Sequence, residues 1–149
     1  KNLKKKVNLP YGILIHGGGW KKMQDKKISN SSFKDLTTKN TGIKKIHNYY
    51  GLIEQTGSIY MECEKGFYHT SNFSDILLRK TLNSLAGIGE KGLVQLISPL
   101  PVSYPGHNIL TQDIGEIFGE DDCACGRKGK YFMIYGRTEE AEIRGCSDA

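Results

Sequence analysis

Glycine is the residue that most constrains how this chain can fold. The 149 residues include 18 glycines, whereas an average usage of about 7% would give roughly ten. Glycine opens the backbone conformations that tight turns need, so this abundance favours short strands joined by turns over a bundle of helices. With 38% hydrophobic residues, a chain of this length can bury the core of one domain without disulfides.

The first third of the sequence predicts a strand, a helix and a second strand. Residues 11–16 form a compact apolar run followed by three glycines, which is typical of a buried strand that leads into a loop. Residues 29–32 offer N-caps for a helix. Gly42 marks the end of this helix, before a second strand over residues 43–50.

After Gly57 the pattern changes to short β segments separated by turn residues, which are most frequent at residues 83–92. We expect strands at residues 58–61, 75–79, 93–98, 116–118, 131–135 and 142–144. The sequence therefore predicts a mixed α/β (α+β) fold. An α/β part over residues 1–57 is followed by a β-rich subdomain over residues 58–149.

The net charge of +5 is concentrated in the first third of the chain, where lysines are frequent. Lysines without interleaved aromatic residues are more typical of a solvated face than of a nucleic-acid site, so we expect no nucleic-acid partner. The same charge suits a polyphosphate such as ATP. No apolar run approaches the ~20 residues that span a bilayer, and no signal-peptide core follows the first lysines. We therefore expect a cytoplasmic protein without a membrane span.

The segment Asn48-Tyr49-Tyr50-Gly51-Leu52-Ile53-Glu54 places an aromatic ring, a glycine and an acid on a turn after a strand. The Tyr50 ring can stack on a base, Gly51 lets the backbone approach a ligand, and the Glu54 carboxylate is a hard oxygen ligand for Mg²⁺. Taken alone, the segment is a weak signal and is more typical of an ordinary turn at the end of a strand.

This segment resembles the YGxTE motif of the adenylate-forming superfamily, and three further stretches match that superfamily in the same order. The glycines after His16 stand where the superfamily has its adenine-contacting loop, Leu110-Thr111-Gln112-Asp113 is similar to the TGD motif, and Gly136-Arg137-Thr138-Glu139 resembles the GR-x-D/E hinge motif. The resemblance implies that Asp113 binds the ribose hydroxyls. The residues that it implies for the nucleotide are Gly17, Gly18, Gly19, Tyr50, Gly51, Glu54, Thr56, Asp113 and Arg137.

Longer stretches resemble the LuxE-type acyl-protein synthetases in particular. They are EQTGSIYMECEKGFYH, SYPGHNILTQDIGEIFGEDDCACGRKGKYF and AEIRGCSD. The resemblance implies that ATP and Mg²⁺ activate a carboxylic (fatty) acid as an acyl-adenylate. The acyl group then passes to a protein cysteine as a thioester and onward to a reductase partner.

Two departures from the superfamily pattern stand out. Ile53 occupies the position where the superfamily has a threonine, and Thr56 is the candidate replacement for the missing hydroxyl. The Ser/Thr/Gly-rich phosphate loop and the lid with its catalytic lysine have no counterpart here. We therefore expect the carboxyl-terminal portion of a synthetase, which alone would not form the adenylate efficiently.

Four cysteines occur, and three of them stand in two local groups with a histidine: Cys63 with His69, and Cys123 with Cys125. Together these side chains supply the three thiolates and one imidazole of a tetrahedral zinc site. Spacing alone does not show that the two pairs meet, and buried small apolar cysteines are the alternative. A resemblance to phenylacetate-CoA-ligase-like proteins, which can hold zinc at these positions, favours a structural zinc.

The fourth cysteine, Cys146, follows Arg144 near the end of the chain. A nearby arginine favours the thiolate, which is the nucleophilic form. From composition alone Cys146 could be incidental, but in the resembled family a cysteine near the carboxyl terminus carries the acyl thioester. The resemblance thus implies Cys146 and Glu54 as catalytic residues, whereas His16, His47 and His107 receive no role.

Two other functions stay open at this point. A phenylacetate-type acyl-CoA ligase would use coenzyme A in place of Cys146 as the acyl acceptor. A non-catalytic, zinc-stabilised binding fragment would explain the missing phosphate loop and would use the basic first third to hold a partner.

Overall fold

The computed structural model describes residues 7–19 and 26–139. The chain divides into two compact units, with the boundary between Asn48 and Tyr49. The predicted strand at residues 142–144 and the predicted acyl carrier Cys146 lie outside the described residues.

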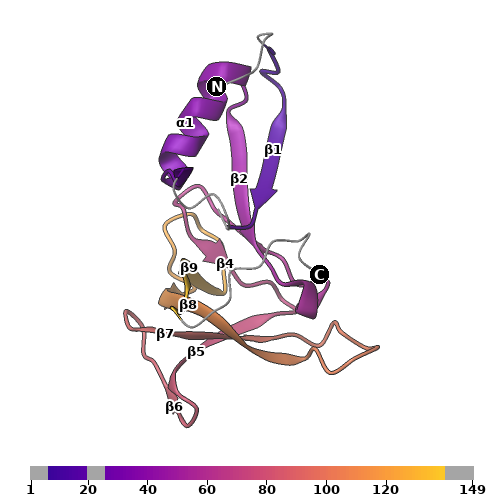
Figure 1. The fold of residues 1–149 in the computed structure, drawn as a ribbon, viewed down its shortest axis with the longest axis vertical. Coiled ribbons are helices and arrows are strands. Elements are labelled where there is room, and N and C mark those ends of the chain that lie inside the picture. Colours follow the sequence, from indigo (N-terminus) through magenta and orange to yellow (C-terminus); the bar gives the residue numbers. More distant parts are fainter. Residues whose placement is uncertain (1–6, 20–25, 140–149) are drawn as a thin grey trace. The chain divides into compact units, whose positions relative to one another are not determined.

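The first unit confirms the predicted order of strand, helix and strand, and Figure 1 shows the helix alongside the two strands. The helix begins after Ser29, whose hydroxyl accepts a hydrogen bond from the Ser32 backbone N–H at 3.1 Å. It ends at Gly42, which has a φ of 74° and donates its N–H to the Thr38 carbonyl. The elements are β1 (Ile13–Gly17), α1 (Asn30–Thr41) and β2 (Lys45–Tyr50).

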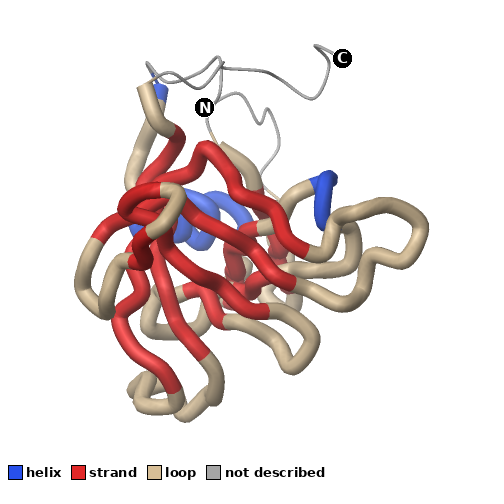
Figure 2. The backbone as a smooth tube through the Cα atoms, turned by 90° about the horizontal axis from the view of Figure 1, so that it is seen from below, coloured by secondary structure: helices blue, strands red, loops and turns tan. Residues whose placement is uncertain are grey.

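The second unit is mainly β structure, and Figure 2 shows its strands in red. The last two residues of β2 pair antiparallel with β3. The other six strands form an antiparallel sheet in the order β4-β9-β8-β7-β5-β6. The elements are the 3-10 helix η2 (Ile53–Gln55), β3 (Tyr60–Met61), β4 (Tyr68–His69), β5 (Asp75–Thr81), β6 (Ser84–Leu85), β7 (Lys91–Ile97), β8 (Asn108–Glu120) and β9 (Lys130–Arg137).

The core of the second unit lies on one face of the six-stranded sheet. Alternate residues of β5 and β7 face each other across the ladder, as in the pairs Ile76–Leu96 and Leu78–Val94. Tyr60 packs its ring on Phe132 of β9 at 5.5 Å between centroids. The buried cluster comprises Tyr60, Ile76, Leu78, Val94, Leu96, Ile117 and Phe132.

The prediction of a short strand at residues 116–118 was wrong, because β8 has 13 residues. Its glycines indicated turns, yet they lie within the strand where a side chain has no room. A Cβ on Gly115 would lie 2.8 Å from the Val94 side chain, and one on Gly119 would lie 2.8 Å from the Tyr131 hydroxyl oxygen. At Gly115, which also lies against the Met133 carbonyl, close packing and not turn geometry favours glycine.

Several predicted boundaries also differ from the structure. The strand expected at residues 58–61 covers only Tyr60–Met61, and the strand expected from residue 43 begins at Lys45. The sequence pattern missed β4 and β6, each of two residues. Strands this short leave no alternation of apolar and polar residues to detect.

Candidate functional site

An irregular part of β8 carries the residue that the sequence singles out for ribose binding. Gln95 of β7 pairs with Leu110 and Leu93 pairs with Ile114, so residues 111–113 of β8 stand opposite Val94 alone. Such a bulge bends a strand and changes the direction of its side chains, and it is frequent beside functional sites.

The partner strand β9 is irregular at the same level. Ile114 pairs with Gly136 and Gly115 with Ile134, so Tyr135 is an extra residue on β9. Gly136 has a φ of 135°, a conformation that favours glycine. These irregularities on β8 and β9 lie next to Asp113 and Arg137, which face each other in the ladder.

Asp113 is a buried carboxylate, with 8% of the residue exposed, and both of its oxygens have partners. Oδ2 accepts a hydrogen bond from the Tyr50 hydroxyl at 2.6 Å, and Oδ1 lies 3.5 Å from Nε of Arg137. A buried charge needs such partners to offset the loss of water. The structure thus brings together three predicted site residues that are far apart in the sequence.

The Tyr50 ring is held among other aromatic rings. Its centroid lies 6.1 Å from Tyr60, 6.2 Å from Tyr68 and 6.3 Å from Phe132. Burial and the charge of Asp113 raise the pKa of Tyr50 well above its ordinary value. Tyr50 therefore stays protonated and keeps its role as a hydrogen-bond donor to Asp113.

The loop after Tyr50 presents Glu54 to solvent on the short helix η2. The next residue, Gln55, is fully buried, and its Nε2 donates to the carbonyl oxygens of Gly106 at 3.0 Å and Leu96 at 3.3 Å. Tyr104 accepts a hydrogen bond from the Thr56 backbone N–H at 3.0 Å. The loop that carries Glu54 is thus tied to β7 and to the connection before β8.

Gln55 and Tyr104 are structurally important residues that the sequence analysis missed. Both lie within stretches that matched the synthetases, but nothing in the local pattern indicates that their side chains are anchors. The Thr56 hydroxyl, the candidate replacement for the missing threonine, donates to the Ile53 carbonyl at 2.9 Å. Gly51 follows Tyr50 directly, whereas Gly17, Gly18 and Gly19 belong to the first unit, and their nucleotide role stays a prediction.

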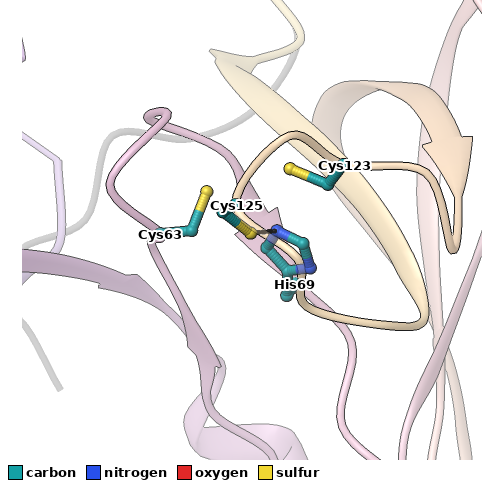
Figure 3. Close-up of side chains that lie close together, drawn as sticks. All are labelled: Cys63, His69, Cys123 and Cys125. Carbon is teal, nitrogen blue, oxygen red and sulfur yellow. Dashed lines mark hydrogen bonds between the residues drawn. The ribbon is translucent and has the colours of Figure 1, made fainter.

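The two pairs of the predicted metal site come together in the second unit. The ligand atoms of Cys63, His69, Cys123 and Cys125 all lie within 4.8 Å of one another, and Figure 3 shows the four side chains gathered around one point. Cys125 Sγ lies 3.4 Å from Nε2 of His69. The pairing of β4 with β9 produces this arrangement, because it sets His69 opposite Tyr131.

The pKa shifts at His69 and Cys125 favour the forms that bind a metal, whereas the shift at Cys123 disfavours the thiolate. Burial and the nearby Arg127 charge lower the pKa of His69, although a backbone interaction with Lys128 opposes them. Burial raises the pKa of Cys123. Burial also favours a higher pKa at Cys125, but the net shift of the Cys125 pKa is downward. It is lowered by hydrogen bonds from the Arg127 backbone N–H and the thiols of Cys123 and Cys63, and by the Arg127 charge. A neutral imidazole and a thiolate are the forms that bind zinc.

Several solved structures share the fold of this chain. The chain is similar to the anthranilate CoA ligase AuaEII in complex with anthranoyl-AMP (TM-score 0.56), to MbtA of Mycobacterium smegmatis (0.56) and to MatB of Rhodopseudomonas palustris (0.57). Each is 14% identical, and the match covers 83–85% of this chain and 24–26% of those chains. The fold is that of a part of an adenylate-forming ligase, as the sequence predicted.

Within this class, the chain belongs to the acyl-protein synthetase family LuxE, whose family model matches residues 3–149. This confirms the resemblance seen in the sequence. A relative, the long-chain-fatty-acid–luciferin-component ligase of Vibrio harveyi, is 28% identical over 138 residues. The match covers 90% of this chain and 35% of that protein, so the chain spans about a third of the length of the curated relative.

The only α-helix in the described part of the chain is α1, with 12 residues. No helix formed by the described residues has the length and apolar character needed to cross a membrane.

Proposed function

We propose that this chain is part of an ATP-dependent acyl-protein synthetase that acts in the cytoplasm. The enzyme activates a fatty acid as an acyl-adenylate, carries the acyl group as a thioester on Cys146 and delivers it to a reductase. Membership of the LuxE family supports this activity. The name of the V. harveyi relative supports a long-chain fatty acid as the substrate. Residues outside this chain complete the active site.

The observation that carries the proposal is the buried carboxylate of Asp113 on the bulge of β8. Tyr50 donates to one oxygen, Arg137 lies beside the other, and each carboxylate oxygen has two lone pairs. Asp113 can therefore accept hydrogen bonds from the two vicinal hydroxyls of a ribose. The side chain of Arg137 is 49% exposed, so its guanidinium can contact the nucleotide as well as Asp113.

The other nucleotide contacts come from the loops. The family resemblance assigns Gly17, Gly18 and Gly19 to the adenine and Gly51 to close approach of the backbone. The Thr56 hydroxyl, which donates to the Ile53 carbonyl, would have to leave that partner to donate to the phosphates. The exposed carboxylate of Glu54 holds Mg²⁺, which neutralises phosphate charge when it is bound.

The reaction proceeds in two displacements. A carboxylate oxygen of the fatty acid attacks the α-phosphorus of ATP, and diphosphate leaves as the acyl-adenylate forms. The thiolate of Cys146 then attacks the acyl carbonyl carbon, and AMP leaves as the thioester forms. Transfer to a thiol of the reductase regenerates Cys146, so that one difficult step is divided into easier ones.

Cys63, His69, Cys123 and Cys125 hold a structural zinc in this proposal. Three thiolates and one imidazole complete a tetrahedral set, which leaves no open position for substrate. The zinc would cross-link the turn after β3 to the turn between β8 and β9. Its role is therefore stability of the sheet and not catalysis.

The test uses the complete enzyme, purified and incubated with ATP, Mg²⁺ and a long-chain fatty acid. We expect fatty-acid-dependent exchange of diphosphate into ATP, together with an acyl group on the protein that neutral hydroxylamine releases. Exchange with an acyl group that appears only on added coenzyme A would identify an acyl-CoA ligase instead. No exchange with any acid would leave the zinc-stabilised binding fragment as the function.

A further inference from the structure

Thr111 makes two hydrogen bonds that hold the bulge of β8 in place. Its hydroxyl donates to the Val94 carbonyl at 2.9 Å and accepts from the Asp113 backbone N–H at 3.0 Å. One side chain therefore joins the bulged backbone to β7 and also fixes the residue that carries the buried carboxylate. Neither hydrogen bond belongs to the regular ladder of the sheet.

The anchor on β7 is rigid. Val94 is fully buried in the core and lies between Leu93 and Gln95, the two residues that restore regular pairing on either side of the bulge. By contrast, the Asp113 side chain is held by the Tyr50 hydroxyl and by Arg137, which is half exposed. The backbone of Asp113 is thus fixed through Thr111, whereas its carboxylate is left with lone pairs for a ligand.

We propose that Thr111 is a positioning residue for Asp113 and thereby sets the preference of the enzyme for nucleotides with free ribose hydroxyls. This inference rests on the proposed function. Two adjacent hydroxyls bind a carboxylate well only when the carboxylate is aimed correctly. In a strand, a shift of one residue turns a side chain to the opposite face, so a bulge that slips would turn Asp113 away from the nucleotide.

The hydroxyl is the part of Thr111 that matters. Valine has the same shape but can neither donate to Val94 nor accept from Asp113, whereas serine keeps both abilities and loses only a methyl group. The comparison of Thr111→Val with Thr111→Ser therefore separates the hydrogen bonds from the packing. Thr81→Val on β5 is a matched control, because Thr81 is an exposed strand threonine whose hydroxyl also makes two hydrogen bonds, one with the Ser84 hydroxyl and one from the Asn83 backbone N–H, outside β8.

The experiment measures kcat/KM of the complete enzyme for ATP and for 2′,3′-dideoxy-ATP in the diphosphate-exchange reaction. We expect the wild type to prefer ATP and the ratio of the two kcat/KM values to fall by about tenfold in Thr111→Val, the order of effect of losing hydrogen bonds at a buried site. Thr111→Ser and Thr81→Val should keep the wild-type preference. A structural role alone would lower both kcat/KM values together and would leave their ratio unchanged.

If the ratio of kcat/KM for ATP to kcat/KM for 2′,3′-dideoxy-ATP is the same in Thr111→Val as in the wild type, the proposal is overturned. The enzyme would still be a synthetase in that case. No reaction of the wild type with ATP overturns the proposed function and this inference together, so the two failures are distinguishable. Hydrogen exchange of the Asp113 amide in the wild-type enzyme is a second measurement that does not depend on how the variants fold. We expect a protected amide, and exchange at the rate of an open loop would contradict the proposal.

Discussion

Cys63 and Cys123 each begin a turn with the same backbone geometry. The Cys63 carbonyl accepts a hydrogen bond from the Gly66 N–H at 2.9 Å, and the Cys123 carbonyl accepts one from the Gly126 N–H at 2.9 Å. Both glycines have a positive φ, 86° and 81°. Two separate turns with the same backbone hydrogen bond thus each carry a cysteine of the four-residue cluster, in which all ligand atoms lie within 4.8 Å of one another.

The first prediction is that the protein binds zinc. Metal analysis of protein purified without chelator should give about one zinc per chain, since the site has four ligands. Cys123→Ser should lose the metal and lower the free energy of unfolding by roughly 4 kcal/mol, as loss of a structural metal does. Cys146→Ser changes the one cysteine outside the cluster and should retain the zinc. A metal-free protein in which Cys123→Ser folds normally would remove zinc from the proposal.

The cluster of Cys63, His69, Cys123 and Cys125 illustrates what could be predicted from the sequence and what could not. Each pair is visible locally, because Cys63 and His69 are close in sequence, as are Cys123 and Cys125. That the pairs meet depends on the antiparallel register of β4 and β9, which joins residues more than sixty positions apart. A two-residue strand such as β4 is too short for its sequence pattern to indicate which strand it pairs with. From the sequence, the meeting of the two pairs of ligands could therefore only be proposed.

Prediction of the candidate nucleotide site was limited in the same way, because its residues are also far apart in the sequence. The motifs identified Tyr50, Asp113 and Arg137 as separate candidates, but the hydrogen bond between Tyr50 and Asp113 follows from the approach of two distant strands. The bulge at residues 111–113 could not be predicted from the sequence for a different reason. Its polar residues and the nearby glycines resemble a turn, although the surrounding residues continue the strand.

A second prediction concerns the buried Gln55. Gln55→Leu keeps the size of the side chain but removes the donor to the Gly106 and Leu96 carbonyls. We expect the free energy of unfolding to fall by about 2 kcal/mol, the cost of leaving buried acceptors unsatisfied. Denaturation followed by circular dichroism measures the change. Gln112→Leu, at an exposed position of β8, should have little effect, and equal stability of the wild type and Gln55→Leu would show that Gln55 does not anchor the loop.

A third prediction concerns Asp113 in the complete enzyme. Asp113→Asn keeps an acceptor for the Tyr50 hydroxyl but removes the charge that faces Arg137 and the ribose. We expect the KM for ATP to rise by about tenfold, since a hydrogen bond to a charged group is stronger than one to a neutral group. Asp113→Ala should show a larger increase in KM. Unchanged ATP kinetics in both variants would contradict the ribose role.

The fourth prediction separates metal binding from nucleotide binding. Glu54→Gln should raise the Mg²⁺ concentration needed for half-maximal adenylate formation by about tenfold, because a carboxylate binds Mg²⁺ far better than an amide. The ATP affinity measured without Mg²⁺ should stay at the wild-type value. Glu120→Gln is a control with an exposed carboxylate at the end of β8. An identical Mg²⁺ dependence in Glu54→Gln and the wild type would exclude Glu54 as a ligand.

The last prediction concerns Cys146, where the acyl-protein synthetase and the acyl-CoA ligase differ most. Serine at this position retains the size of the side chain, but its hydroxyl is a much weaker nucleophile than a thiolate. Cys146→Ser should therefore form acyl-adenylate from ATP and fatty acid at the wild-type rate, because the first displacement does not use the thiol. It should carry no acyl group that neutral hydroxylamine releases, since that reagent cleaves a thioester and spares an ordinary ester.

The same variant should also fail to supply acyl groups to a reductase, while Ser147→Ala should behave as the wild type. Radiolabelled fatty acid measures all three properties, as adenylate in solution, as label on the protein and as label on the reductase. A Cys146→Ser enzyme that still becomes acylated and transfers its acyl group would show that Cys146 is not the carrier. If the label instead moves from the adenylate to coenzyme A in both proteins, the acyl acceptor is the small thiol and the enzyme is an acyl-CoA ligase.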